Sequence, residues 1–127
     1  MVNRTKELGQ PAIALTDHGN LHGAIEFYQA AKKVGVKPII GVECYVADGS
    51  RSERNPAKRF PFHMTLLAQN RAGYQNLLKL VTASHLEGFY YRPRMDREIL
   101  EKYSEGLIAL SGCPSGELAR SIKAGDL

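Results

Sequence analysis

Ala12-Ile-Ala-Leu-Thr-Asp-His-Gly-Asn20 is the stretch that decides the fold of this chain. It is a short apolar run that stops abruptly at a carboxylate, an imidazole and a glycine. Residues 12–16 predict a buried strand, and Gly19-Asn20 then turns the chain into a helical pattern. Asp17 and His18 therefore lie at the carboxyl end of a strand. In parallel α/β folds ligands gather at that end, so we expect further strands to carry more groups to the same edge.

Strands and helices alternate along the rest of the chain. Apolar runs predict strands at residues 12–16, 39–46, 62–68 and 106–112. Helical patterns cover residues 2–8, 21–34, 70–81, 96–103 and 113–122, and residues 88–94 form an aromatic connector. Parallel neighbours need helical crossovers, so this order predicts an α/β domain with a mostly parallel sheet, either open or part of a barrel.

Two of the predicted helices have clear start signals. Asn20 is expected to cap the helix at residues 21–34, and Asn70 the helix at residues 70–81. The apolar positions expected to face the core are Leu21, Ala24, Ile25, Tyr28, Ala31 and Val34 in the first helix, and Tyr74, Leu77, Leu78 and Val81 in the second. Both helices are therefore predicted to cover a sheet.

Length and composition favour one small domain in the cytoplasm. The chain has 127 residues, of which 43% are hydrophobic, which is enough for a core. No run approaches the roughly 18 apolar residues of a membrane helix, and the first residues lack the apolar segment of a signal peptide. We therefore expect no membrane partner. Two cysteines are too few for a disulfide scaffold, so we expect reduced thiols.

Positive charge is concentrated in one aperiodic stretch. The chain carries a net charge of +4, and residues 48–61 hold Arg51, Arg54, Lys58 and Arg59 within a long loop that contains prolines. A solvated connector is the plainer interpretation. The alternative is a mobile positive surface that attracts phosphates without sequence preference.

Groups with metal-binding chemistry recur at the ends of the predicted strands. Asp17 and His18 end the first strand, Glu43 interrupts the apolar second strand, His63 opens the third, and Cys113 follows the fourth. A buried carboxylate needs a partner, and a cation is one. Imidazole, carboxylate and thiolate together suit zinc, and the hard ligands also admit manganese or iron. From spacing alone, ordinary packing is the plainer interpretation of these residues, because their wide separation in sequence means that only the fold could bring them together.

The strand ends make a geometric prediction. His18, Glu43 and Cys113 each lie at or near a strand's carboxyl end, so they should converge on one rim of the sheet. His63 is the member that this argument does not place, because it stands at the beginning of its strand. Cys44, between apolar neighbours, is expected to fill the core, and His22 and His85 to be surface or packing residues on helices.

Several segments resemble one family. They are residues 14–28 (Ala-Leu-Thr-Asp-His-Gly-Asn-Leu-His-Gly-Ala-Ile-Glu-Phe-Tyr), 37–43 (Lys-Pro-Ile-Ile-Gly-Val-Glu), 63–68 (His-Met-Thr-Leu-Leu-Ala), 76–80 (Asn-Leu-Leu-Lys-Leu) and 105–113 (Glu-Gly-Leu-Ile-Ala-Leu-Ser-Gly-Cys). In this order they closely resemble the polymerase and histidinol phosphatase (PHP) domain of bacterial DNA polymerase III alpha subunits. The resemblance implies a distorted, TIM-like (β/α) barrel with a trinuclear metal centre.

Carried over by position, the resemblance implies that His18, Glu43, His63 and Cys113 are metal ligands and that Asp17 is a catalytic or supporting carboxylate. Zinc is the metal most favoured. The family's amino-terminal His-x-His strand and late Asp-x-His strand have no counterpart in residues 1–127, which are therefore expected to be a single partial domain. Only four of the family's nine metal ligands have a counterpart in this sequence, so we do not expect the full trinuclear centre.

The implied function is that of a fragment of a replicative DNA polymerase. In the whole protein this part would serve as a metal-binding scaffold and remove mispaired 3′ nucleotides as a 3′–5′ exonuclease, with DNA, the other polymerase domains and replisome subunits as partners. The basic loop would then serve DNA approach or packing. The alternatives left open are a stand-alone metal-dependent phosphoesterase of the same superfamily and a metal-free structural module.

Overall fold

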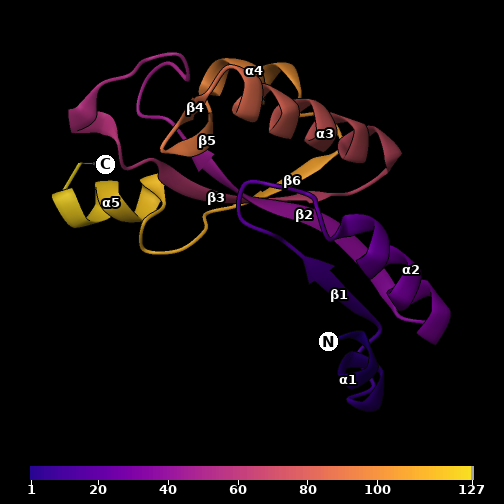
Figure 1. Ribbon diagram of the computed structural model, residues 1–127. Coiled ribbons are helices and arrows are strands. Elements are labelled where there is room, and N and C mark those ends of the chain that lie inside the picture. Colours follow the sequence, from indigo (N-terminus) through magenta and orange to yellow (C-terminus); the bar gives the residue numbers. More distant parts are fainter. Residues whose placement is uncertain (127) are drawn as a thin grey trace.

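The computed structural model describes residues 1–126, arranged as a sheet with helices packed around it (Figure 1). The strands are β1 (Ala12–Leu15), β2 (Lys37–Val46), β3 (Phe62–Ala68), β4 (Phe89–Tyr90), β5 (Arg92–Met95) and β6 (Leu107–Leu110). The helices are α1 (Val2–Glu7), α2 (Ala24–Val34), α3 (Arg71–Leu86), α4 (Arg97–Lys102) and α5 (Glu117–Ala124), with a short 3-10 helix, η1 (Pro56–Lys58). None of these helices is long and apolar enough to cross a membrane.

The long strand β2 organises the sheet. Its first half pairs with β1 in parallel, its second half pairs with β5 in parallel on the same side, and β3 lies antiparallel along its other side. The edge strand β6 pairs antiparallel with β3, and β4 pairs antiparallel with β5. The domain is thus α/β, as predicted.

The expectation of a mostly parallel sheet is wrong. Only β1–β2 and β2–β5 pair in parallel within residues 1–126. The physical reason lies in the connection from β2 to β3, which contains η1 but no helix long enough for a crossover. A loop without a crossover helix returns the chain to the sheet in the opposite direction, which gives antiparallel neighbours.

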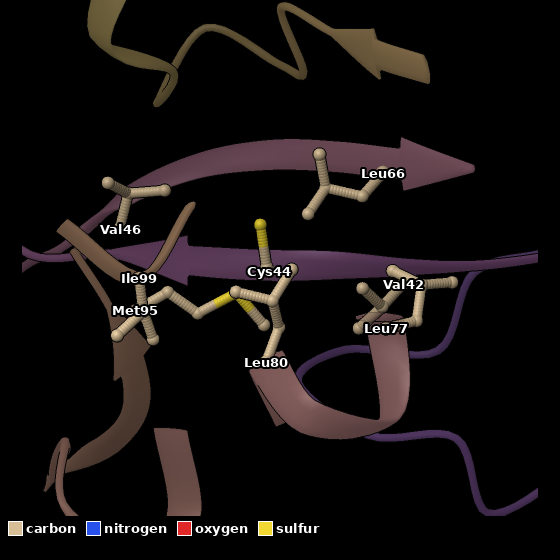
Figure 2. Packing of buried hydrophobic residues seen from close by; sticks show 8 residues of the cluster. All are labelled: Val42, Cys44, Val46, Leu66, Leu77, Leu80, Met95 and Ile99. Carbon is tan, nitrogen blue, oxygen red and sulfur yellow. The ribbon is translucent and has the colours of Figure 1, made fainter. Parts of the chain in front are cut away.

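The core lies on one face of β2. Side chains alternate along a strand, and Val42, Cys44 and Val46 belong to one buried cluster with Leu77 and Leu80 of α3 (Figure 2). The other members of this buried cluster are Leu66, Met95 and Ile99. Glu43 and Tyr45, at the intervening positions, consequently belong to the opposite face of β2. This alternation separates the packing face of the sheet from the face that carries the candidate site.

Cys44 is a core residue, as the sequence predicted. Its side chain is fully buried, and its thiol donates a hydrogen bond to the Met64 carbonyl oxygen at 3.1 Å. Burial raises the pKa of the Cys44 thiol to about 12, because the charged thiolate would lose its hydration there.

The start of α2 differs from the prediction. Asn20 does not cap this helix, which begins only at Ala24 after Gly23. The Asn20 side chain instead forms a local turn, in which it accepts a hydrogen bond from the His22 N–H and donates one to the His18 carbonyl oxygen. Asn70 caps α3 as predicted, because its side chain accepts a hydrogen bond from the Gly73 N–H.

The buried face of α2 also differs from the prediction. Phe27 is buried together with Ala24 and Ala31, whereas Ile25 and Tyr28 are exposed. The apolar spacing is therefore helical, as expected, but the buried face of α2 is centred on Ala24, Phe27 and Ala31 and leaves Ile25 and Tyr28 outside it.

The predicted aromatic connector at residues 88–94 is a β-hairpin. Its strands β4 and β5 are joined at Tyr91, which has a φ of 57° in the left-handed region. The hairpin escapes sequence analysis because its strands are short and because β5 is completed only by pairing with β2, far away in the sequence. It brings Arg92 and Tyr91 to the side of the sheet that carries Tyr45.

Candidate metal centre

Strand direction brings the predicted ligands to one edge of the sheet. The strands β1, β2 and β6 run the same way, and β3 runs against β2 and β6. The carboxyl ends of the first three strands therefore meet the beginning of β3. This is why His63, at the start of its strand, joins residues that end theirs.

Glu43 is at the centre of the group. Its Oε2 lies 3.3 Å from Nε2 of His18, and its Oε1 lies 3.2 Å from Nδ1 of His63. The same His63 nitrogen lies 3.3 Å from the Sγ of Cys113. The predicted convergence of His18, Glu43 and Cys113 is confirmed, and His63 is its connecting member.

The donor atoms fit a metal ion. The ligand atoms of Glu43, His63 and Cys113 all lie within 4.8 Å of one another. Tetrahedral ligands at roughly 2.0–2.3 Å from zinc are about 3.3–3.8 Å apart, so small side-chain adjustments suffice. Oxygen, nitrogen and sulfur donors together are the set that zinc accepts most readily. The Glu43 side chain is 24% exposed, so the group is open to solvent.

Backbone pairing holds the first two candidate ligands, His18 and Glu43, together. The Glu43 N–H donates to the Asp17 carbonyl oxygen at 3.1 Å, and the Gly19 N–H donates to the Glu43 carbonyl oxygen at 2.9 Å. This bridge places His18 beside Glu43. Gly19 has a φ of +66°, and a Cβ there would lie 2.8 Å from the Pro93 ring, so the turn requires glycine.

The loop after β6 places Cys113 against the start of β3. The His63 N–H donates to the Ser115 carbonyl oxygen at 3.2 Å, and the Ser115 N–H points at the Cys113 sulfur at 3.4 Å. The thiol of Cys113 is exposed, in contrast to that of Cys44. This thiol is thus accessible to a metal ion.

Asp17 is turned away from this group of donors. Its Oδ2 accepts a hydrogen bond from the Gly23 N–H at 3.4 Å, where α2 begins. The carboxylate is therefore positioned next to His18 in sequence but is engaged with the start of a helix. This contact anchors the turn that carries His18.

The basic loop is not one cationic cluster. Arg51 pairs with Glu87 at 2.7 Å, Asp96 at 3.0 Å and Glu98 at 3.2 Å. The hydrogen bond that Arg51 donates to the Glu87 carboxylate is the main cause that raises the pKa of its guanidinium above the usual range. Lys58 pairs with Glu53. These carboxylates neutralise much of the charge that the sequence placed in this loop.

The two remaining cations of the loop differ from each other. Arg54 donates to the carbonyl oxygens of Arg51 and Glu87. Arg59 is exposed beside Phe60 and faces the hollow that contains His18 and His63. Of the four predicted DNA-contacting residues, Arg59 is thus the one placed next to the candidate metal centre.

Sequence reasoning missed one residue that supports the site. His85 of α3 has its Nε2 2.8 Å from the Gly19 carbonyl oxygen. A carbonyl oxygen only accepts hydrogen bonds, so Nε2 carries the proton in this contact. No local signal in the sequence marks this role, because His85 and Gly19 are 66 positions apart.

A mixed α/β sheet whose edge gathers carboxylate, imidazole and thiol side chains defines a class of metal-dependent domains. The family model for the PHP domain matches residues 1–126, and the chain belongs to this family. Three similar proteins are DNA polymerase III alpha subunits. Identity is 52% over 126 residues with that of Borreliella burgdorferi, 56% over 115 residues with that of Thermus aquaticus and 48% over 123 residues with that of Aquifex aeolicus.

These matches cover most of this chain but little of the relatives. The aligned regions make up 98%, 88% and 91% of this chain, and 11%, 9% and 11% of the three relatives, respectively. The chain thus spans about a tenth of the length of the curated relatives that it matches. It corresponds to their PHP region.

Proposed function

We propose that this chain is part of a bacterial replicative DNA polymerase, in which it is a metal-binding scaffold with 3′–5′ exonuclease activity. The observation that carries the proposal is the contact series from His18 through Glu43 and His63 to Cys113. The similarity to DNA polymerase III alpha subunits supports the polymerase context over a stand-alone phosphoesterase. DNA, other polymerase domains and replisome subunits are then its partners, in the cytoplasm.

His18, Glu43, His63 and Cys113 would hold a divalent metal, with zinc the best match to these donors and manganese or iron the alternatives. When bound, such a metal activates a water molecule and neutralises charge on the scissile phosphate. We do not assign a full trinuclear centre to these four residues. Residues outside 1–127 would have to complete it.

The protein groups have separable tasks in this proposal. Glu43 lies between two imidazoles, so its charge keeps both rings directed at the same point. Cys113 must lose its proton to bind a metal, so binding should release protons and weaken at low pH. For Asp17 we retain a catalytic or supporting role, exerted through the turn that its carboxylate ties to Gly23.

The first prediction concerns the loss of a ligand. In the full-length polymerase that contains this sequence, His63→Ala should lower bound metal and 3′ exonuclease rate by more than the roughly 10–100-fold that loss of an outer hydrogen-bond partner costs. DNA synthesis on a primed template should be retained. Metal content by mass spectrometry and degradation of an oligonucleotide with a mispaired 3′ end are the measurements.

His22→Ala is the matched control, because His22 is an exposed histidine that is not part of the group formed by Glu43, His63 and Cys113. It should leave both quantities unchanged. Equal metal content in the wild-type protein and the His63→Ala variant would contradict the ligand assignment. Metal binding with no exonuclease activity would restrict the domain to a metal-binding scaffold.

A further inference from the structure

The candidate metal centre opens into a hollow of about 870 Å³. His18 and His63 form part of its wall, so any group bound there reaches the metal ligands directly. Tyr45 forms another part and stacks edge-on against His63, with ring centres 5.3 Å apart. The volume falls within the roughly 300–1,000 Å³ of small-molecule sites, so it suits one or two nucleotides better than a duplex.

Three arginines from separate parts of the chain line this hollow. Arg59 precedes β3, Arg92 begins β5 and Arg120 lies in α5. Within residues 1–126 none of the three forms an ion pair, whereas Arg51 has three acidic partners. No aspartate or glutamate in that part of the chain lines the hollow. The hollow therefore presents positive charge that the described residues leave uncompensated.

The arginines are held in place by contacts that leave donors free. The Arg92 guanidinium carbon lies 5.7 Å from the ring centre of Tyr45, and that of Arg59 lies 4.7 Å from Phe60. Arg120 donates to the Pro61 carbonyl oxygen at 3.2 Å. A guanidinium presents five N–H donors, so each of these groups retains donors for phosphate oxygens.

Two aromatic side chains in the hollow are highly exposed. Tyr91 is 66% exposed and Phe60 is 65% exposed, and both line the hollow. Tyr91 also has a left-handed φ of 57°, which is uncommon for a bulky residue and is found at functional sites. Exposed rings beside cations are the combination on which unpaired bases stack.

We infer that this hollow binds the unpaired 3′ end of single-stranded nucleic acid, with Arg59, Arg92 and Arg120 on the phosphates and Tyr91 and Phe60 stacked on bases. This inference rests on the proposed exonuclease function and specifies its substrate. Every base has a face that can stack, so binding has little sequence preference. A base-paired 3′ end does not bind in this way, because its bases are paired and stacked within the duplex and cannot stack on Tyr91 or Phe60.

The test uses the full-length polymerase, with synthesis on a primed template as the check that each variant is folded. Tyr91→Ala and Arg92→Ala should each raise the exonuclease KM for a single-stranded oligonucleotide about tenfold, with metal content unchanged. Arg92→Ala should also lower the salt dependence of log KM by about 0.7, which is one lost phosphate contact on a single strand. Tyr28→Ala and Arg4→Ala, at exposed positions outside the hollow, are the matched controls and should leave KM unchanged.

A second readout is independent of turnover. An oligonucleotide with 5-iodouracil near its unpaired 3′ end should crosslink to the peptides that contain Tyr91 or Phe60, and a fully paired end should not. Crosslinking without turnover would support the inference while the proposed exonuclease function fails. Turnover with normal KM in both variants and no crosslink to these peptides would overturn the inference while the proposed function stands.

Discussion

At the scale of single residues, the candidate metal centre depends on the backbone groups of Gly19 as well as on the side chains of the candidate ligands. Gly19 lets the chain turn immediately after His18, and its N–H and carbonyl groups contact Glu43 and His85. The two cysteines show how environment separates chemically identical groups. Cys44 is buried beneath α3, and Cys113 is exposed beside His63.

This contrast predicts selective alkylation. At pH 8 iodoacetamide should modify Cys113 and leave Cys44 unmodified, because a pKa of about 12 leaves roughly one part in ten thousand of the Cys44 thiol ionised. Zinc held tenfold above its dissociation constant should slow the modification of Cys113 about tenfold. Peptide mass spectrometry measures both.

The Glu43→Gln variant is the control for this experiment, since zinc should protect Cys113 much less once the central carboxylate is lost. Unchanged alkylation of Cys113 in the presence of zinc would exclude this thiol from the metal site.

At the scale of elements, the connection between β2 and β3 is fixed by a buried arginine. Arg94 is 2% exposed and donates to the carbonyl oxygens of Gly88, Arg51 and Glu53 at 3.0, 2.8 and 2.7 Å. Burial lowers the pKa of its guanidinium, but these acceptors compensate the charge. The contacts join the loop at residues 47–61 to the hairpin of β4 and β5.

Arg94→Met should therefore loosen this loop. The substitution leaves buried carbonyl groups without donors, at a cost of about 3 kcal/mol, which raises the population of open loop roughly 100-fold. Limited trypsin digestion of the full-length protein should then cleave after Arg54, Lys58 or Arg59 at a correspondingly higher rate. Arg97→Met, an exposed position, is the control. Equal cleavage rates in the two variants would show that Arg94 does not hold the loop.

At the scale of the whole molecule, several apolar side chains remain exposed in the described residues. Ile108 and Leu110 on β6, and Leu118 and Ile122 on α5, are 44% to 56% exposed, and β6 pairs only with β3 in residues 1–126. The sheet described here does not close into a barrel. The partial barrel implied by the family is consistent with this open edge.

The proposal that residues outside 1–127 complete the metal site makes a prediction about zinc affinity. If it is correct, residues 1–127 alone hold zinc with lower affinity than the longer protein, because water cannot replace those protein ligands without loss of affinity. Competition with a chelating dye, carried out on both proteins at the same pH, measures the difference. Equal affinities would mean that the four residues found here form the complete site.

Local patterns in the sequence determined much of this structure. Apolar periodicity predicted β1, β2, β3 and β6 and the helices between them, since side-chain burial repeats with the period of each element. The interruption of an apolar strand by Glu43 and the ending of another at Asp17-His18 marked the site. Cys113, after another strand, belonged to the same set of strand-end groups, and the resemblance to the PHP family implied that His18, Glu43, His63 and Cys113 are metal ligands.

Tertiary structure alone decided the features that depend on contacts between distant residues. The direction of β3, which carries His63 to Glu43, follows from how the chain returns after β2. Arg51 meets Asp96 across 45 positions, which turned a predicted cationic loop into an ion-pair network, and the hollow with Arg59 and Arg92 forms only when separate segments pack. Periodicity records which face of an element is buried, whereas partner and direction are set by the long-range packing of the whole chain.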